Sequence, residues 1–304
     1  MNNKRLNGVK EMPQICLGTV IQMELRMEEI KERIKGAIDK GYEHIDCADG
    51  YGGEEYMNMM KDVIEYGIRI HGRDKFWITW KSDNITDEHI RGIIYFLGCG
   101  YIDLFLIHHP RLETYNQLEC LADLKMRGYL RNIGLSNYEN AERLMRIDDR
   151  LLVKYGFGIY ANQIQASPIE ARGIINGRDG RDRKNYVDLL ELCNTRNIRL
   201  MFYSPYNGIM DKLMDHGRYN ILGIGTNSNN IRIEFGRKVI GYYTRLYLKG
   251  KNNVLMVGIS SGKSCIINYE TIKNILDTKD RRNKDSENNK FINNLIKEHG
   301  LSKK

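Results

Sequence analysis

Short apolar runs rich in β-branched and aromatic residues recur along the chain, with helix-like segments between them. Runs of this composition are typical of buried strands. They lie at residues 15–17, 44–46, 76–80, 102–107, 133–135, 161–165, 199–203 and 254–257. The helix-like segments lie at residues 27–40, 54–66, 86–97, 114–126, 140–152, 185–195 and 239–248. Thr86 precedes two acidic residues, as a helix N-cap does, and Gly41 and Gly128 follow the ends of two other helices.

This alternation of strand and helix predicts an α/β protein with a (β/α)8 TIM barrel. From the second run to the seventh, successive strands begin 26 to 38 residues apart, which leaves room for one helix in each interval. A doubly wound open sheet is the rival fold. Its usual dinucleotide-binding fingerprint, G-x-G-x-x-G, does not follow the first strand.

The chain is expected to form a single barrel domain over residues 1–276, because no stretch rich in Pro, Gly or Ser separates two units. Residues 204–237 form the longest irregular stretch, which is typical of a functional loop or of disorder. Residues 277–304 are charged and rich in Asn, and we expect a partly helical tail there.

Composition favours a folded, cytoplasmic protein. The 304 residues are 41% hydrophobic and 28% charged, which is ordinary for a globular chain. No apolar run reaches the roughly 18 residues that a membrane span needs, and residues 1–10 carry no signal-peptide core. The six cysteines form no C-x-x-C pair, so we expect reduced thiols.

Charge is uneven along the chain. Residues 1–170 hold 22 Lys and Arg against 26 Asp and Glu, whereas residues 171–253 hold 15 against 7, a net charge of +8 for that segment. A basic segment can bind nucleic acid, an anionic lipid surface or a phosphorylated cofactor, or it can be an ordinary solvated surface. No nucleic-acid reader motif accompanies the charge, so no nucleic-acid or membrane partner is expected.

Several polar residues follow the predicted strands, where the active site of such a barrel lies. Alone, each has an ordinary structural interpretation, such as a turn residue, a packed ring or a solvated strand end. Their occurrence at successive strand ends favours a common site. These residues are Asp46 and Tyr51 after the second strand, Lys81 after the third, His108 after the fourth, Ser136 and Asn137 after the fifth, Gln163 or Gln165 in the sixth, and Tyr203 and Ser204 at the seventh.

The four titratable residues among them suit reduction of a carbonyl group. A tyrosine phenol titrates near pH 10, and the Lys81 ammonium is expected to lower the pKa of Tyr51. Asp46 can supply the counter-ion that a buried Lys81 needs, and His108 can donate a hydrogen bond to an oxygen that gains charge. Because no side chain supplies a hydride, a nicotinamide cofactor must do so.

A metal site is not expected. His108 and His109 are adjacent, so on a strand their side chains would point to opposite faces. The sequence contains no H-x-x-x-H motif and no cysteine cluster that would add further ligands.

Several motifs, in order, resemble the aldo-keto reductase superfamily over residues 6–276. They are LNGVKEMPQICLGT at 6–19, GYEHIDCADGYGGE at 41–54, YIDLFLIHHP at 101–110, GYLRNIGLSNY at 128–138, NQIQASP at 162–168 and FYSPYNG at 202–208. The resemblance implies a TIM barrel with a short N-terminal β-hairpin, a small carbonyl substrate and a monomer.

The resemblance also implies roles for individual residues. The catalytic residues would be Asp46, Tyr51, Lys81 and His108, with Tyr51 as the proton donor. The cofactor-binding residues would be Gly18, Thr19, Asp46, Ser136, Asn137, Gln163, Tyr203, Ser204, Ser260 and Lys263. The alternative function is a nucleotide-binding regulatory protein, or a catalytically weak one, on the same barrel.

Departures from the family pattern bear on the choice of cofactor. Ile259 stands where a phosphate-binding lysine is usual, and Cys265 stands near the place of an arginine. Lys263 and the basic residues of 171–253 can supply replacement charge, with Arg218, Arg232 and Arg237 as possible partners. We therefore expect NADP(H) to be preferred over NAD(H), but only modestly. Val20 stands where a substrate-pocket aromatic is common, and the substrate is left open.

Overall fold

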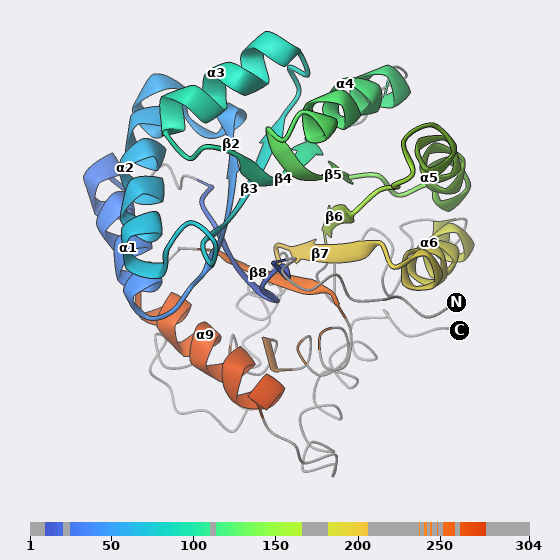
Figure 1. Ribbon diagram of the computed structural model, residues 1–304. Helices are drawn as coiled ribbons and strands as arrows, with labels where there is room; N and C mark the ends of the chain where they lie inside the picture. The colour runs from blue at the N-terminus through green and yellow to red at the C-terminus, as the bar shows by residue number, and fades with distance from the viewer. Residues whose placement is uncertain are drawn as a thin grey trace.

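Eight parallel strands close into a barrel in chain order in the computed structural model, which confirms the (β/α)8 prediction (Figure 1). The structure describes residues 10–20, 25–109, 114–165, 182–205, 252–258 and 262–277, together with residues 237, 240, 241, 244 and 248. The strands are β1 Ile15–Gly18, β2 His44–Ala48, β3 Trp77–Ser82, β4 Ile102–Ile107, β5 Leu130–Ser136, β6 Ala161–Gln165, β7 Arg199–Tyr203 and β8 Val254–Gly258. Each strand pairs with the next, and β1 pairs with β8.

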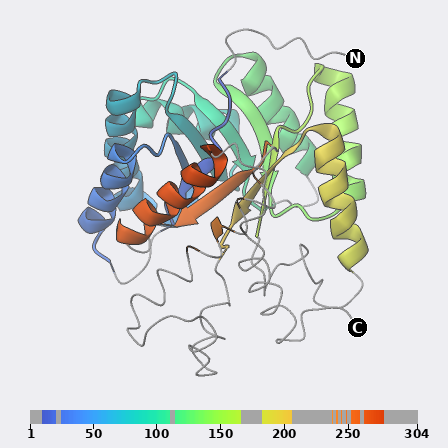
Figure 2. The same ribbon diagram turned by 90° about the horizontal axis from the view of Figure 1, so that it is seen from below.

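Helices surround the barrel in the described part of the chain. They are α1 Met27–Asp39, α2 Gly53–His71, α3 Asp87–Leu97, α4 Thr114–Met126, α5 Ala141–Tyr155, α6 Asp182–Arg196 and α9 Gly262–Asp277, with a short 3-10 turn η1 at Asp49–Tyr51. The pattern did not predict α9, which lies beside α1 in both views (Figures 1 and 2). Tyr42, which lies between α1 and β2, meets Tyr269 of α9 at this seam, with ring centroids 4.8 Å apart. None of the described helices has the length and apolarity needed to cross a bilayer.

Three predictions fall outside the described residues. The N-terminal hairpin was expected mainly in residues 1–9, the tail was expected over 277–304, and the segment at 239–248 is described at only four positions.

One helix is clearly longer than the pattern indicated. Helix α2, expected to end at Tyr66, continues to His71, because its apolar face extends far enough to bury Gly67 against Phe76.

Side chains along each strand alternate between the barrel interior and the surrounding helices. The interior cluster is apolar near the start of the strands and includes Cys16, Trp77, Leu104, Met201 and Met256. The outward-facing residues, among them Leu17, Ile78, Phe105, Phe202 and Leu255, pack in a second and larger cluster that includes helix residues. The apolar interior cluster lies toward the start of the strands, and the polar residues of the interior lie toward their C-terminal ends.

Local signals at the helix ends agree with the predictions. The Thr86 side chain accepts a hydrogen bond from the His89 N–H of α3 at 3.3 Å, as an N-cap does. Gly98 ends this helix in the left-handed region at φ 63°.

Strands β5 and β6 approach each other closely at Gly134, because a Cβ there would lie 2.2 Å from the Ala161 carbonyl oxygen. That contact sets the distance between the strands that carry Ser136 and Gln163.

Candidate active site

The alternation within the strands brings Asp46, Lys81 and Gln163 together inside the barrel. The three residues belong to β2, β3 and β6, and all are almost completely buried near the C-terminal strand ends. Lys81 Nζ donates to Asp46 Oδ2, and Gln163 Nε2 donates to Asp46 Oδ1 at 2.7 Å. Both carboxylate oxygens therefore have partners, which a buried charge requires.

Two opposing effects act on the pKa values of this ion pair: burial favours the neutral forms, and the neighbouring charges and hydrogen bonds favour the charged forms. Burial raises the pKa of Asp46, while Lys81 and Gln163 act in the opposite direction. Burial alone would lower the pKa of Lys81, but Asp46 and Tyr51 outweigh it and raise that pKa above its usual value. We therefore treat Lys81 as a charged ammonium that Asp46 neutralises.

Tyr51 lies beside this ion pair, in the turn η1 that follows β2. The Lys81 Nζ atom is 5.0 Å from the centroid of its ring, and the His108 ring meets it edge-on at 5.9 Å. Burial raises the pKa of Tyr51 to about 12, although Lys81 acts to lower it. The sequence predicted a net decrease, which does not occur because desolvation of the phenolate exceeds the effect of the ammonium. Tyr51 is consequently a neutral phenol at pH 7.

His108 follows β4 and completes the group. Its backbone N–H donates to the Ser82 carbonyl oxygen at 2.9 Å, which fixes the chain directly after β3 and β4. The side chain is half-buried. Burial, then the charges of Lys81 and His109, lower the pKa of His108 to about 4. At neutral pH the ring is uncharged, and one of its nitrogens can donate a hydrogen bond.

The residues predicted to hold a nicotinamide are joined by hydrogen bonds through Asn137. The Asn137 Nδ2 donates to the His108 carbonyl oxygen at 3.1 Å and to Ser136 Oγ at 3.2 Å. Its Oδ1 accepts from the Tyr203 hydroxyl at 2.6 Å, and its backbone N–H donates to the Gln163 carbonyl oxygen at 2.7 Å. Asn137 adopts φ 59°, a left-handed conformation that asparagine tolerates better than most residues. Strands β5, β6 and β7 thus contribute to one polar rim.

The remaining predicted contacts lie around β1 and β8. The Thr19 hydroxyl donates to the Asp46 carbonyl oxygen at 2.8 Å and shares a hydrogen bond of 2.7 Å with Tyr56. Gly18 pairs with Asp46 and, on the other side, with Gly258. Ser204 is exposed just after β7. Ser260, Ile259, Arg218 and Arg232 lie outside the described residues, and Lys263 is described only as part of the α9 backbone.

The two adjacent histidines do not point to opposite faces as the sequence indicated. Strand β4 ends at Ile107, so His108 and His109 follow a bend in which their rings stack with centroids 4.2 Å apart. His109 Nδ1 lies 3.0 Å from Asp83 Oδ2. The argument for an absence of metal ligands was wrong on this point, because it treated both histidines as strand residues.

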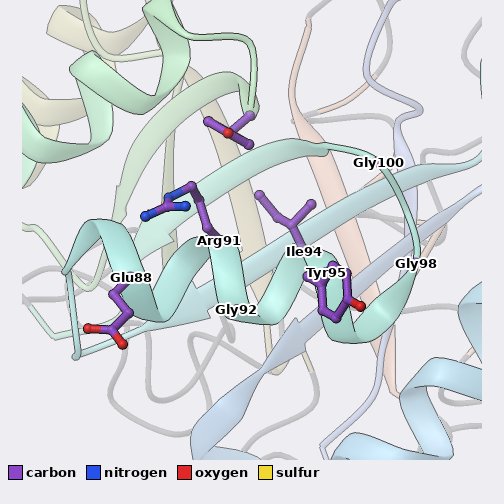
Figure 3. Close-up of a pocket in the computed structure, with 8 residues that line it drawn as sticks. Glu88, Arg91, Gly92, Ile94, Tyr95, Gly98 and Gly100 are labelled. Atoms are coloured by element: carbon purple, nitrogen blue, oxygen red, sulfur yellow. The ribbon is translucent and has the colours of Figure 1, made fainter.

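A wide depression of about 690 Å³ lies elsewhere, along the outer face of α3 (Figure 3). Its lining includes Arg91 and Tyr95 on that helix and Gly100 and Tyr129 before β4 and β5. These last two residues lie near the N-terminal ends of the strands, away from the polar rim. Because barrel active sites lie at the C-terminal ends, we assign this depression no catalytic role.

Comparison with known proteins identifies relatives over most of the chain. Residues 14–229 match the model of the Aldo/keto reductase family. Aldose reductase C of Dictyostelium discoideum is 27% identical over 238 residues, which cover 67% of each chain. The crystal structure of a Bombyx mori aldo-keto reductase in complex with NADP is similar with a TM-score of 0.63 at 20% identity, covering 87% of this chain and 88% of that one. The aldose reductase structure from Giardia lamblia gives a TM-score of 0.66 at 17% identity, covering 95% and 94%.

Proposed function

Because the chain belongs to the aldo/keto reductase family and is therefore an oxidoreductase, we propose that it reduces small aldehydes and ketones with NADP(H), with Tyr51 as proton donor. One observation carries the residue assignment. A neutral phenol, a neutral imidazole and a buried ammonium meet at the C-terminal end of the barrel. This combination can give a proton to a carbonyl oxygen and stabilise the anion that remains.

The donor and acceptor groups at the rim fit the nicotinamide end of a dinucleotide. Ser136, Asn137 and Gln163 carry a hydroxyl and two amides of the kind that hydrogen-bond a carboxamide, and a bound carboxamide would replace some of the hydrogen bonds that these groups make with their neighbours. Tyr203 adds an aromatic ring on the adjacent strand. When bound, the nicotinamide supplies the hydride. The NADP in the Bombyx mori relative supports NADP(H) over NAD(H), as does the basic segment at 171–253.

Each residue then has a separate task in the proton transfer. The Tyr51 hydroxyl gives its proton to the carbonyl oxygen of the substrate as that oxygen gains negative charge. Lys81 stabilises the phenolate that is left, and Asp46 keeps Lys81 charged and in place. His108 donates a hydrogen bond to the same oxygen and orients it toward the phenol. Solvent returns the proton to Tyr51 after the alcohol leaves.

The experiment that tests this function follows the absorbance of NADPH and NADH with the purified full-length chain and a panel of aldehydes and ketones. We expect oxidation of NADPH that depends on a carbonyl substrate, and a single species at the mass of a monomer in sedimentation. Tight NADPH binding, measured by protein fluorescence, without turnover on any substrate would instead support the nucleotide-binding alternative.

A further inference from the structure

We propose that Asp83, His108 and His109 form a binding site for a divalent transition-metal ion such as Zn²⁺ at the mouth of the active site. One ligand atom from each of the three side chains lies within 4.8 Å of the other two. Two imidazoles and one carboxylate are the ligand types that zinc takes in proteins that leave a coordination position open. Elsewhere among the residues that the structure describes, no other three such side chains converge in this way.

The contact between Asp83 and His109 is close to the spacing of two ligands in a metal complex, and the ligand atom of His108 lies within 4.8 Å of both. Ligand atoms bound to a tetrahedral zinc at roughly 2.0–2.2 Å lie about 3.3 Å from one another. Asp83 Oδ2 and His109 Nδ1 are already 3.0 Å apart, and the rings of His108 and His109 are stacked at 4.2 Å. Small rotations of the side chains would therefore close the site. The His109 proton would move to Nε2, so that Nδ1 could bind the metal in place of its hydrogen bond to Asp83.

The backbone holds the three side chains together. Asp83 follows β3 and the two histidines follow β4, and these two strands pair along their length. The His109 backbone N–H also donates to Asp83 Oδ1 at 2.9 Å, which orients the carboxylate. The side chains of Asp83 and His109 are 40% and 57% exposed, so metal ions can reach them and water can fill the remaining coordination position.

A nearby histidine provides a matched comparison. His89 Nε2 lies 2.8 Å from Asp49 Oδ2, a contact like that of His109 with Asp83. The third neighbour of this pair is the Ser82 hydroxyl, which lies 2.7 Å from Asp49, and not a second imidazole. His89 and Asp49 should therefore bind zinc much more weakly.

The consequence for activity rests on the proposed function. A metal ion bound to a ring nitrogen of His108 would fix the tautomer and the orientation of the imidazole that is proposed to donate to the carbonyl oxygen of the substrate. Zinc should therefore inhibit the reductase reversibly, and the metal-free protein should be the active form. Because the metal is not needed for the proton transfer, a strong chelator should leave basal activity intact.

The binding experiment uses the full-length chain after chelator treatment and measures Zn²⁺ affinity by competition with a chromogenic chelator. His109→Phe keeps the stacked ring but removes its nitrogens, and we expect the affinity to fall by at least roughly 10–100-fold, the loss usual for a supporting residue alone. Asp83→Asn should also weaken binding, whereas His89→Phe should not. Absence of zinc binding in the wild-type chain, or equal affinity in all variants, would overturn the proposal.

The activity experiment separates this site from the proposed function. Zinc should inhibit carbonyl reduction by the wild-type chain, and His109→Phe should keep normal basal activity while needing 10–100-fold more zinc for the same inhibition. Equal inhibition of both proteins would show that zinc acts elsewhere and would refute the inhibitory role. If no carbonyl compound is reduced at all, the proposed function fails, but the competition measurement still decides whether the metal site exists.

Discussion

Replacing Asp46 with asparagine should destabilise the barrel strongly, because it leaves the Lys81 ammonium buried without a counter-charge. The two side chains are 0% and 1% exposed, so water cannot solvate the remaining charge. Removing one partner of such a buried pair typically costs about 3–5 kcal/mol. The asparagine amide adds a further conflict, since its nitrogen must face either Lys81 or the Gln163 Nε2, which are both donors.

Urea unfolding and thermal unfolding, each followed by circular dichroism, measure this cost as a free energy of unfolding and as a melting temperature. For a chain of this size, about 2 °C of melting temperature corresponds to 1 kcal/mol, so we expect a decrease of roughly 6–10 °C. The double variant Asp46→Asn/Lys81→Met provides the control, because it removes the buried charge, and it should be more stable than Asp46→Asn alone. Strictly additive losses, or an Asp46→Asn loss below 1 kcal/mol, would refute the description of a buried, charged pair.

Three further predictions concern turnover, pH and the cofactor. Lys81→Met should lower kcat by at least about 10²-fold with a smaller effect on NADPH affinity, because the ammonium stabilises the Tyr51 phenolate; equal losses in both quantities would contradict this. Burial lowers the pKa of His44 to about 3, so the folded state binds fewer protons than the unfolded one as pH falls below 6.5. Urea unfolding should show about 2 kcal/mol less stability at pH 5 than at pH 7 from this residue, a slope that His44→Asn should remove. Lys263→Ala should weaken NADPH binding by roughly tenfold and leave NADH unchanged, as measured by fluorescence titration; equal values for both cofactors would argue against a phosphate contact there.

The barrel and the convergence of the four titratable residues follow from the sequence for a simple reason. The two-residue alternation of side chains along a strand determines which residues face the barrel interior. The position of each strand in the sequence determines which residues lie at its C-terminal end, and parallel strands bring those ends together. Asp46 and Lys81 are both at inward-facing positions, so their ion pair could be expected from alternation alone. The same alternation could have placed Gln163 against Asp46, a contact that the sequence interpretation missed because it assigned this amide only to the cofactor.

Two features could not be derived from the sequence because they depend on three-dimensional packing. The pKa of Tyr51 depends mainly on how deeply its side chain is buried, and the pattern of residues along the chain does not reveal that burial. The stacking of His108 on His109 depends on where β4 ends, and the apolar run continues up to His108 without a breaking residue. Helix α9 escaped prediction because polar residues such as Asn268, Glu270 and Lys273 interrupt its apolar residues and weaken the pattern.

The most direct test of the central claim compares kcat of Tyr51→Phe with kcat of Tyr56→Phe on the best carbonyl substrate. The two rings meet edge-on at 5.9 Å, but the Tyr56 hydroxyl bonds to Thr19 and is not near His108 in the described contacts. If Tyr51 is the proton donor, Tyr51→Phe loses roughly 10²–10⁴-fold in kcat with little change in NADPH affinity, while Tyr56→Phe keeps most of its activity. Near-normal turnover in Tyr51→Phe, or equal losses in both variants, would contradict the proposed mechanism.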